Sequence, residues 1–291
     1  MTHAALNVLD AVVKIPCADQ DMLGILSLPP PGVQRKNVAL VIVVGGAQYR
    51  AGSHRQFVLL ARRLATAGYP VLRFDMRGMG DTPGQACDFE NTQADITAAL
   101  DVLPSLAPGI EKVVLWGLCD GASASLLYLQ ATQDPRVAGL CLLNPWLRSE
   151  ASLARTQVRH YYGRRLLEAA FWRKLWRGGV GWQALAGLGR NLRTAFTARS
   201  TQPHPALSYQ ERMAMGWRSF GGAILLLLSE RDLTAQEFLG QAQQDALWVG
   251  SLKKPGVSQH LLSNADHTLS ATTSRLQMEE LTLQWLDEIA A

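Results

Sequence analysis

The sequence predicts an α/β protein whose mostly parallel central sheet is covered by helices on both faces. Short segments rich in Val, Ile and Leu alternate with longer amphipathic segments, which is the pattern of repeated strand–helix units. Residues 38–44 are almost continuously apolar, as expected for a strand buried on both faces. The length of 291 residues is enough for one large domain of this kind with an insertion.

The N-terminal half begins with two strands and then changes to strand–helix units. Residues 11–15 and 22–28 predict strands joined by a polar turn, and the Pro-Pro-Pro-Gly run at 29–32 ends this pattern. After the strand at 38–44, Ser53 is expected to cap a helix over 54–67 whose apolar residues share one face. The further elements expected in this half are strands at 70–74, 112–116 and 137–143 and a helix at 92–103.

The alternation of strands and helices stops after Pro145 and resumes near residue 221. The resumed units are strands at 223–228 and 257–262 and helices at 235–248 and 273–290. The sequence therefore predicts a core formed by residues 1–145 and 221–291, with residues 146–220 inserted as a helical lid.

Basic residues are concentrated in this insert. Residues 148–199 contain 11 Lys and Arg but only 2 Asp and Glu, whereas the rest of the chain contains 17 and 22. Together with Trp146, Trp172, Trp176 and Trp182, this predicts a mobile basic lid that selects anionic or membrane-associated substrates and makes peripheral contact with an anionic membrane. The alternative is a lid whose aromatic side chains pack on the core and whose arginines are solvated.

The composition argues against several classes of protein. A net charge of +4 is too small to indicate nucleic-acid binding. The four cysteines are irregularly spaced without a Cys-x-x-Cys pair, so no zinc site, disulfide framework or other metal or cofactor is expected. The N-terminus lacks the pattern of a signal peptide, and the apolar runs are too short to span a bilayer. These features predict a protein of the reducing cytoplasm.

The most informative motif is Gly-x-Cys-x-Gly at 117–121, between a predicted strand and a helix of small residues. Cys119 stands on a strained turn where bulkier neighbours would clash with the adjoining strand or helix. The N-terminus of the following helix points at the thiol and favours its negatively charged form. This pattern resembles the nucleophile elbow of the α/β-hydrolase fold, with cysteine in place of serine. The alternative is a buried cysteine that serves only as a small apolar side chain.

A cysteine nucleophile needs a base, and the base needs an acid that orients it. Asp232 follows the strand at 223–228 and His267 follows the strand at 257–262, which is the chain order nucleophile, acid, base of this fold. The carboxyl ends of parallel strands lie at one edge of a sheet, so Cys119, Asp232 and His267 are expected to meet there as a catalytic triad. Glu230 competes with Asp232 for the role of the acid.

Two loops are expected to bind the substrate. The oxyanion hole is expected to use the N–H of Asp120 and an N–H of the loop at 45–48, with Ala47 favoured. The charge of Asp120 opposes thiolate formation unless it pairs with a basic group. The residues predicted to contact the substrate are Gly46, Gln48, Arg50, His54 and Arg55. The basic members of this set can bind an anionic group, or they are solvated or structural charges.

Other blocks of the chain also resemble known families. Residues 73–81 resemble the D-x-R-G-x-G-x-S turn of the α/β-hydrolase superfamily, with Asp81 before Thr82 at the serine end, and residues 265–268 resemble its histidine motif. The blocks at 44–57, 116–120 and 143–151 resemble the exosortase A system-associated α/β-hydrolases, the first of their two types. This resemblance implies a Gram-negative protein linked to an exopolysaccharide and protein-sorting gene cluster, and it implies no particular substrate.

Together these observations predict a hydrolase or acyl-transfer enzyme with a Cys-His-Asp triad. The expected substrate is an ester, thioester or lactone, as a small molecule or a lipid-linked acyl compound, because a thiolate attacks activated acyl groups better than amides. The alternative is a catalytically silent binding or regulatory protein of the same fold, which the cysteine and the adjacent Asp120 leave open.

Overall fold

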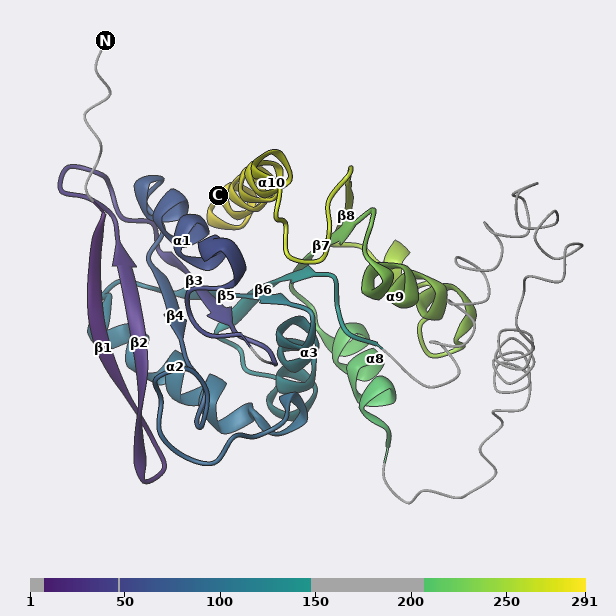
Figure 1. Cartoon of the computed structure of the whole chain (residues 1–291), viewed down its shortest axis with the longest axis horizontal. Coiled ribbons are helices and arrows are strands. Elements are labelled where there is room, and N and C mark those ends of the chain that lie inside the picture. The colour runs from purple at the N-terminus through teal and green to yellow at the C-terminus, as the bar shows by residue number, and fades with distance from the viewer. Residues whose placement is uncertain (1–7, 47, 148–206) are drawn as a thin grey trace, which may run out of the picture.

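The centre of the molecule is an eight-stranded sheet with the strand order β1-β2-β4-β3-β5-β6-β7-β8 (Figure 1). The computed structural model describes residues 8–46, 48–147 and 207–291. β1 and β2 form an antiparallel pair, β2 is antiparallel to β4, and all further pairs are parallel. The mostly parallel sheet predicted from the sequence is therefore confirmed. The strands are β1 (Leu9–Cys17), β2 (Gln20–Leu28), β3 (Val38–Val43), β4 (Val71–Phe74), β5 (Lys112–Leu118), β6 (Val137–Leu143), β7 (Ala223–Ser229) and β8 (Val257–Leu262).

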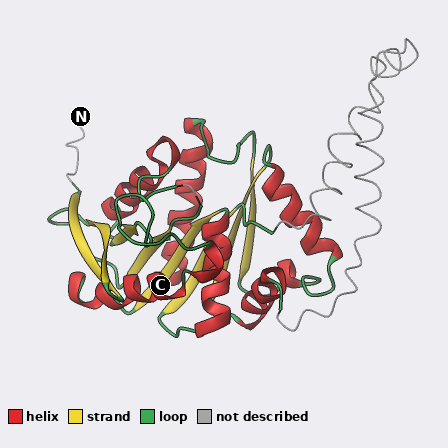
Figure 2. Ribbon diagram, turned by 60° about the horizontal axis from the view of Figure 1, so that its bottom comes forward, coloured by secondary structure: helices red, strands yellow, loops and turns green. Residues whose placement is uncertain are grey.

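Helices cover both faces of the sheet (Figure 2). The helices are α1 (Gln56–Thr66), α2 (Gln93–Leu106), α3 (Asp120–Thr132), α8 (Tyr209–Ser219), α9 (Leu233–Gln244) and α10 (Thr272–Ala290). Because side chains alternate along a strand, β3 sends Leu40 and Ile42 toward α1 and α10, and Val41 and Val43 toward α2 and α3. The sheet thus separates two apolar clusters, and α8 and α9 belong to the cluster with α2 and α3.

The start of α1 differs from the prediction. Ser53 does not cap this helix, because Ser53–Arg55 forms a short 3-10 helix, η1, and α1 begins at Gln56 without a side-chain cap. His54 and Arg55 have φ angles of 53° and 60°, so the chain turns through left-handed conformations before the helix. The buried side of α1, which includes Phe57, secures the helix in place of a cap. Two further 3-10 helices are η2 (Phe89–Asn91) and η4 (Ser251–Lys253).

α8 lies within the range predicted as a lid, yet it packs in the helical layer beside α3. Its residues Met213 and Trp217 are fully buried, and the ring of Trp217 stacks edge-on against that of Trp248. A Cβ atom on Gly216 would lie 2.3 Å from the carbonyl oxygen of Leu126 in α3, which shows how closely the two helices approach. Residues 148–206 of the predicted lid, with Trp172, Trp176 and Trp182, lie outside the described residues.

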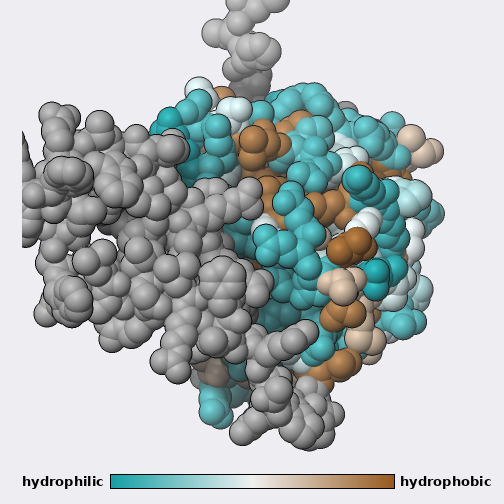
Figure 3. Space-filling view, turned by 90° about the vertical axis from the view of Figure 1, so that its right-hand side faces the viewer, coloured by the Kyte–Doolittle hydropathy of each residue, from teal (hydrophilic) through white to brown (hydrophobic). Residues whose placement is uncertain are grey.

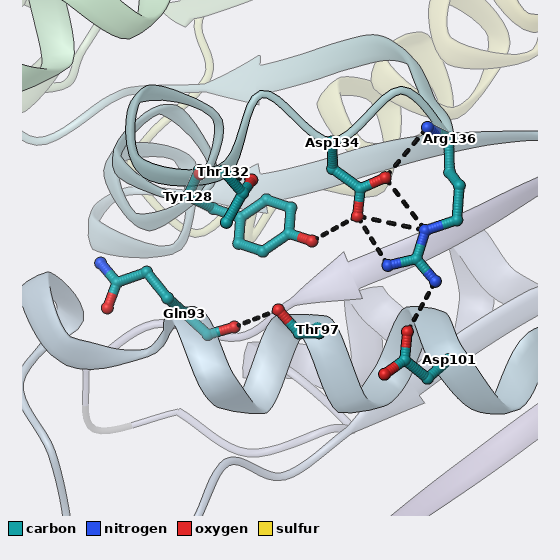
Figure 4. A network of polar contacts seen from close by, with 7 residues as sticks. All are labelled: Gln93, Thr97, Asp101, Tyr128, Thr132, Asp134 and Arg136. Atoms are coloured by element: carbon teal, nitrogen blue, oxygen red, sulfur yellow. Dashed lines mark hydrogen bonds and ion pairs between the residues drawn. The ribbon is translucent and has the colours of Figure 1, made fainter.

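A polar network fixes the C-terminal end of α3 (Figure 4). The hydroxyl of Tyr128 donates to Asp134 at 2.6 Å, and the guanidinium of Arg136 pairs with Asp134 at 2.6 Å and with Asp101 of α2 at 2.7 Å. Hydrogen bonds from Arg136 and from Tyr128, together with the charge of Arg136, lower the pKa of Asp134 to about 2, although burial acts to raise it. The network connects the C-terminal end of α3 to α2. The N-terminal end of the same helix follows directly after Cys119.

Candidate active site

Cys119 occupies the turn between β5 and α3. It is the N-cap residue of α3 and has φ and ψ angles of 59° and −122°, a conformation that is strained for any residue with a Cβ atom. A Cβ atom on Gly117 would lie 2.5 Å from the backbone nitrogen of Ala122, and one on Gly121 would lie 2.3 Å from the carbonyl oxygen of Val43. Both glycines of the motif are therefore required by close backbone contacts, as the sequence predicts.

Asp232 and His267 meet at the same edge of the sheet as Cys119. Asp232 lies just beyond β7, and His267 lies in the loop between β8 and α10. Nδ1 of His267 and Oδ2 of Asp232 are 2.8 Å apart. Because an ionised carboxylate can only accept, the imidazole N–H donates this hydrogen bond. The Asp232 side chain is almost fully buried, and a third of the His267 side chain is exposed.

The surroundings of His267 stabilise its charged form. The hydrogen bond to Asp232, and after it a hydrogen bond to Cys119, raise the pKa of His267 to about 10, although burial acts in the opposite direction. The imidazole is therefore hydrogen-bonded to the Asp232 carboxylate and lies near enough to Cys119 for the thiol to affect its pKa. In this arrangement the ring can take up a proton from Cys119 while Asp232 balances the resulting charge.

Glu230, the competing acid, points elsewhere. Its exposed carboxylate accepts a hydrogen bond of 2.7 Å from the backbone N–H of Asn264. The structure thus pairs Asp232, rather than Glu230, with the imidazole of His267.

The carboxylate of Asp120 lies over the loop that was predicted to form the oxyanion hole. A Cβ atom on Gly45 would lie 2.0 Å from its Oδ1, and one on Gly46 would lie 2.6 Å from its Oδ2. Burial raises the pKa of Asp120, whereas hydrogen bonds from its own N–H and from that of Gly121, together with the charge of His267, act to lower it. Ala47, the other predicted donor, lies outside the described residues.

Arg50 has a structural role in this loop. Its guanidinium pairs with the buried carboxylate of Asp75 and lies 2.6 Å from a carboxylate oxygen of Asp81, and its N–H donates to Asp75 at 2.6 Å. These contacts fasten the loop after β3 to the turn after β4. Arg50, predicted to contact the substrate, therefore has its charge balanced within the protein.

The other residues predicted to contact the substrate lie nearer to solvent. His54, Arg55 and Gly46 are exposed, and Gln48 is half-buried with an Oε1 atom that has no hydrogen-bond partner in the described structure. After hydrogen bonds from Ser270, the charge of His54 also helps to lower the pKa of Asp266, the neighbour of His267.

One buried polar pair at this edge was not predicted. Asn144, directly after β6, exchanges two hydrogen bonds with Ser229 at the end of β7, and both residues are almost fully buried. The sequence signal is the Asn144-Pro145 pair, which follows the predicted strand at 137–143 and lies in the family-like block at 143–151. An Asn with a φ angle of 47° before a proline indicates a special turn, but this angle is visible only in the structure.

The described part of the chain shows neither a metal centre nor a membrane span. It contains no group of three or more His, Cys, Asp or Glu side chains that could hold a metal ion. None of the helices in residues 8–46, 48–147 and 207–291 is long and apolar enough to cross a membrane.

Comparison with protein families assigns the chain. Residues 35–218 match the serine aminopeptidase S33 family, which is more than half of the sequence. The chain belongs to this family of α/β-hydrolases. At the elbow this α/β-hydrolase carries Cys119.

Individual relatives of this α/β-hydrolase are distant. The esterase Pf2001 of Pyrococcus furiosus superposes with a TM-score of 0.64 at 15% identity, over 100% of this chain and 94% of that one. XC6422 of Xanthomonas campestris, an α/β serine hydrolase without a lid, has a TM-score of 0.58 at 13% identity, over 96% and 94% of the two chains. At such identities the similarity concerns the fold alone.

A curated fungal protein matches a shorter stretch. The hydrolase pyiE of Pyricularia grisea is 27% identical in an alignment of 154 positions that covers 49% of this chain and 33% of the fungal protein. This α/β-hydrolase thus matches only a third of the length of that relative.

Proposed function

We propose that this α/β-hydrolase cleaves an ester, thioester or lactone, or transfers its acyl group, with Cys119 as the nucleophile. The observation that supports the proposal is the hydrogen bond of 2.8 Å between His267 and Asp232, at the same carboxyl edge of the sheet as the elbow that carries Cys119. A nucleophile, a base and an acid that orients the base are the groups that covalent acyl transfer requires.

In the proposed reaction, the proton of the Cys119 thiol already resides on the imidazole of His267, and the thiolate sulfur attacks the carbonyl carbon. The tetrahedral intermediate collapses to a thioester on Cys119, and the imidazolium gives its proton to the leaving alcohol or thiol. Water, or an acceptor alcohol in acyl transfer, then attacks the thioester with His267 as the base. Asp232 holds the ring and stabilises the imidazolium in both halves.

The oxyanion is proposed to bind the N–H groups of Asp120 and Ala47. Because the carboxylate of Asp120 lies over Gly45 and Gly46, the arriving oxyanion has to enter beside a buried acidic group. Leu233, the residue after Asp232, is exposed and offers apolar surface for an acyl chain. Figure 3 shows that apolar and polar residues are mixed on the described part of the face that it draws.

A labelling and activity experiment tests the nucleophile. We expect Cys119→Ala to fold normally and to lose several orders of magnitude in turnover of a short-chain nitrophenyl ester. Cys87→Ala, which removes a half-buried thiol elsewhere, is the matched control and should keep its activity. Burial raises the pKa of Cys17 and Cys141, so iodoacetamide should label Cys119 long before these two thiols.

Wild-type turnover by folded Cys119→Ala would exclude the mechanism. Fast labelling of Cys119 without turnover of any acyl ester would instead favour the binding or regulatory alternative.

The basic sequence at 148–199 is proposed to attract an anionic or membrane-associated substrate, because it contains 11 basic and 2 acidic residues. The attraction should weaken as salt shortens the screening length from about 10 Å at 0.1 M to about 3 Å at 1 M. We therefore expect KM for a carboxylate-bearing ester to rise with salt, while KM for a neutral ester of equal size stays constant. Equal salt dependence of both esters, with no sedimentation on anionic vesicles, would contradict this proposal.

We also propose a place for the enzyme in an exopolysaccharide and exosortase system. The support is the resemblance of the blocks at 44–57, 116–120 and 143–151 to hydrolases of that system. Deleting the gene should change the amount or acylation of secreted polysaccharide, and a Cys119→Ala copy should fail to restore it. Full restoration by the Cys119→Ala copy would show that the protein's role in the cell does not require Cys119 as a nucleophile.

A further inference from the structure

The turn after β6 lies between the two strands that carry the nucleophile and the acid. In the sheet, β6 is paired with β5 on one side and with β7 on the other. β5 leads into Cys119, and β7 leads into Asp232. A turn at the end of β6 can therefore reach both loops.

Toward β7, Asn144 continues the sheet where its ladder stops. The last backbone pair between these strands is Leu143 with Leu227. Beyond it, the Asn144 amide group donates to the hydroxyl of Ser229 at 3.0 Å and accepts from the Ser229 N–H at 2.8 Å. The side chain thus acts as one more rung of the ladder, and the carbonyl of Ser229 accepts a hydrogen bond of 3.2 Å from the N–H of Asp232.

Toward β5, the same turn holds the backbone of the nucleophile. The N–H of Cys119 donates to the carbonyl of Leu143 at 2.9 Å, and its carbonyl accepts from the N–H of Trp146 at 3.2 Å. Ser123 of α3 donates to the carbonyl of Trp146 at 2.6 Å. The left-handed conformation of Asn144, with a φ angle of 47°, reverses the chain between Leu143 and Trp146 so that both reach Cys119.

We propose that Asn144 is a positioning residue that sets the distance between Cys119 and Asp232, and through Asp232 the orientation of His267. This inference rests on the proposed function. Asn144 is fully buried and has its amide group satisfied on both sides by Ser229, so it contacts no substrate. Its effect is to keep the hydrogen bond of 2.8 Å between Asp232 and His267 aligned with the sulfur of Cys119.

The test uses two variants that remove different numbers of the hydrogen bonds between Asn144 and Ser229. Asn144→Gly removes both side-chain hydrogen bonds but keeps the left-handed backbone accessible. Ser229→Ala removes only the hydroxyl, so the Ser229 N–H still donates to Asn144. Thr282→Val in α10 is the matched control, because it deletes a buried hydroxyl that bonds Met278, away from the carboxyl edge of the sheet.

We expect kcat for a nitrophenyl ester to fall about 100-fold in Asn144→Gly, because a displacement of about 1 Å has this effect on a reacting pair. KM should change less than about twofold, because the residue does not touch the substrate. The pKa of His267, followed by NMR of its ring, should fall from about 10 toward the ordinary imidazole value. Ser229→Ala should give smaller shifts in the same direction, and Thr282→Val should give none.

Unchanged kcat and an unchanged His267 titration in a folded Asn144→Gly protein would overturn the inference. So would a loss of kcat with an unchanged His267 titration, since the residue would then act elsewhere. If Asn144→Gly does not fold, the same readouts in Ser229→Ala decide. A wild-type protein without any acyl turnover would contradict the proposed function, while a shifted His267 titration in the variants would still support the positioning role.

Discussion

The carboxylate of Asp232 serves a helix and an imidazole at the same time. Its Oδ1 accepts a hydrogen bond of 3.1 Å from the N–H of Thr234 and so caps α9, while its Oδ2 accepts from His267. The cap fixes the carboxylate before any substrate arrives. The geometry thus removes rotational freedom that a solvent-exposed acid such as Glu230 would keep.

Asp232→Asn is expected to lower kcat for an activated ester by about 100- to 10,000-fold, because an amide cannot balance the charge on His267 and favours the wrong tautomer. The fold should survive, since the amide oxygen can still cap α9. Glu230→Gln, the matched control, should stay within about twofold of the wild type. A larger loss in Glu230→Gln than in Asp232→Asn would reverse the assignment of the acid.

Among the elements, α8 shows how closely a helix can approach its neighbour when the contact residue is glycine. Gly216 faces the backbone of α3, and a Cβ atom would meet the carbonyl of Leu126 at 2.3 Å. A Cβ atom built on Gly240 of α9, by contrast, would have no neighbouring atom within 4 Å. The two glycines therefore differ in packing although both lie within helices.

The pair predicts opposite effects of the same substitution. Gly216→Ala should lower the free energy of unfolding by about 1–3 kcal/mol, because the added methyl group forces α8 away from α3. Gly240→Ala should raise it by about 0.5–1 kcal/mol, because alanine is the better helix former at an uncrowded position. Urea unfolding of both variants measures the difference. A stabilising Gly216→Ala would show that α8 does not depend on this contact.

The sequence predicted the elements whose pattern is local. The apolar runs of β3 and β7 and the small residues around Cys119 were sufficient, because burial on both faces and close packing restrict residue type directly. The sequence did not predict the role of residues whose contacts are with partners distant in the chain. Arg50 could not be assigned to Asp75 and Asp81, because an arginine in a loop looks the same whether it is paired or free. Asn144 and α8 were missed for the same reason, since Ser229 and α3 supply their partners.

For the molecule as a whole, Asp134 and His267 make stability depend on pH in opposite directions. His267 has a pKa of about 10 in the folded chain, above its ordinary value, so its contribution is complete below about pH 6.5 and is lost as the pH rises toward 10. Asp134 has a pKa of about 2, below its ordinary value, so its contribution is complete above about pH 4 and is lost as the pH falls toward 2.

Thermal unfolding across pH 2–10 should therefore show separate acid and alkaline limbs. His267→Gln should flatten the alkaline limb without changing the acid limb, and Asp134→Asn should do the reverse. Because Arg136 is partly exposed, Asp134 is expected to contribute about 1–2 kcal/mol near neutral pH. An alkaline limb that is unchanged in His267→Gln would mean that the ring is not charged in the folded protein.

The sheet also explains how the chain accommodates its longest connection. The crossover from β5 to β6 uses residues 119–136, whereas the crossover from β6 to β7 uses residues 144–222, about four times as many. The entropy of closing a flexible loop grows only with the logarithm of its length, so this fourfold increase costs about 1 kcal/mol. Evolution can therefore lengthen or exchange the segment at this crossover at little expense in equilibrium stability. The long connection is expected to lower the folding rate instead, because β6 and β7 pair across a large sequence separation.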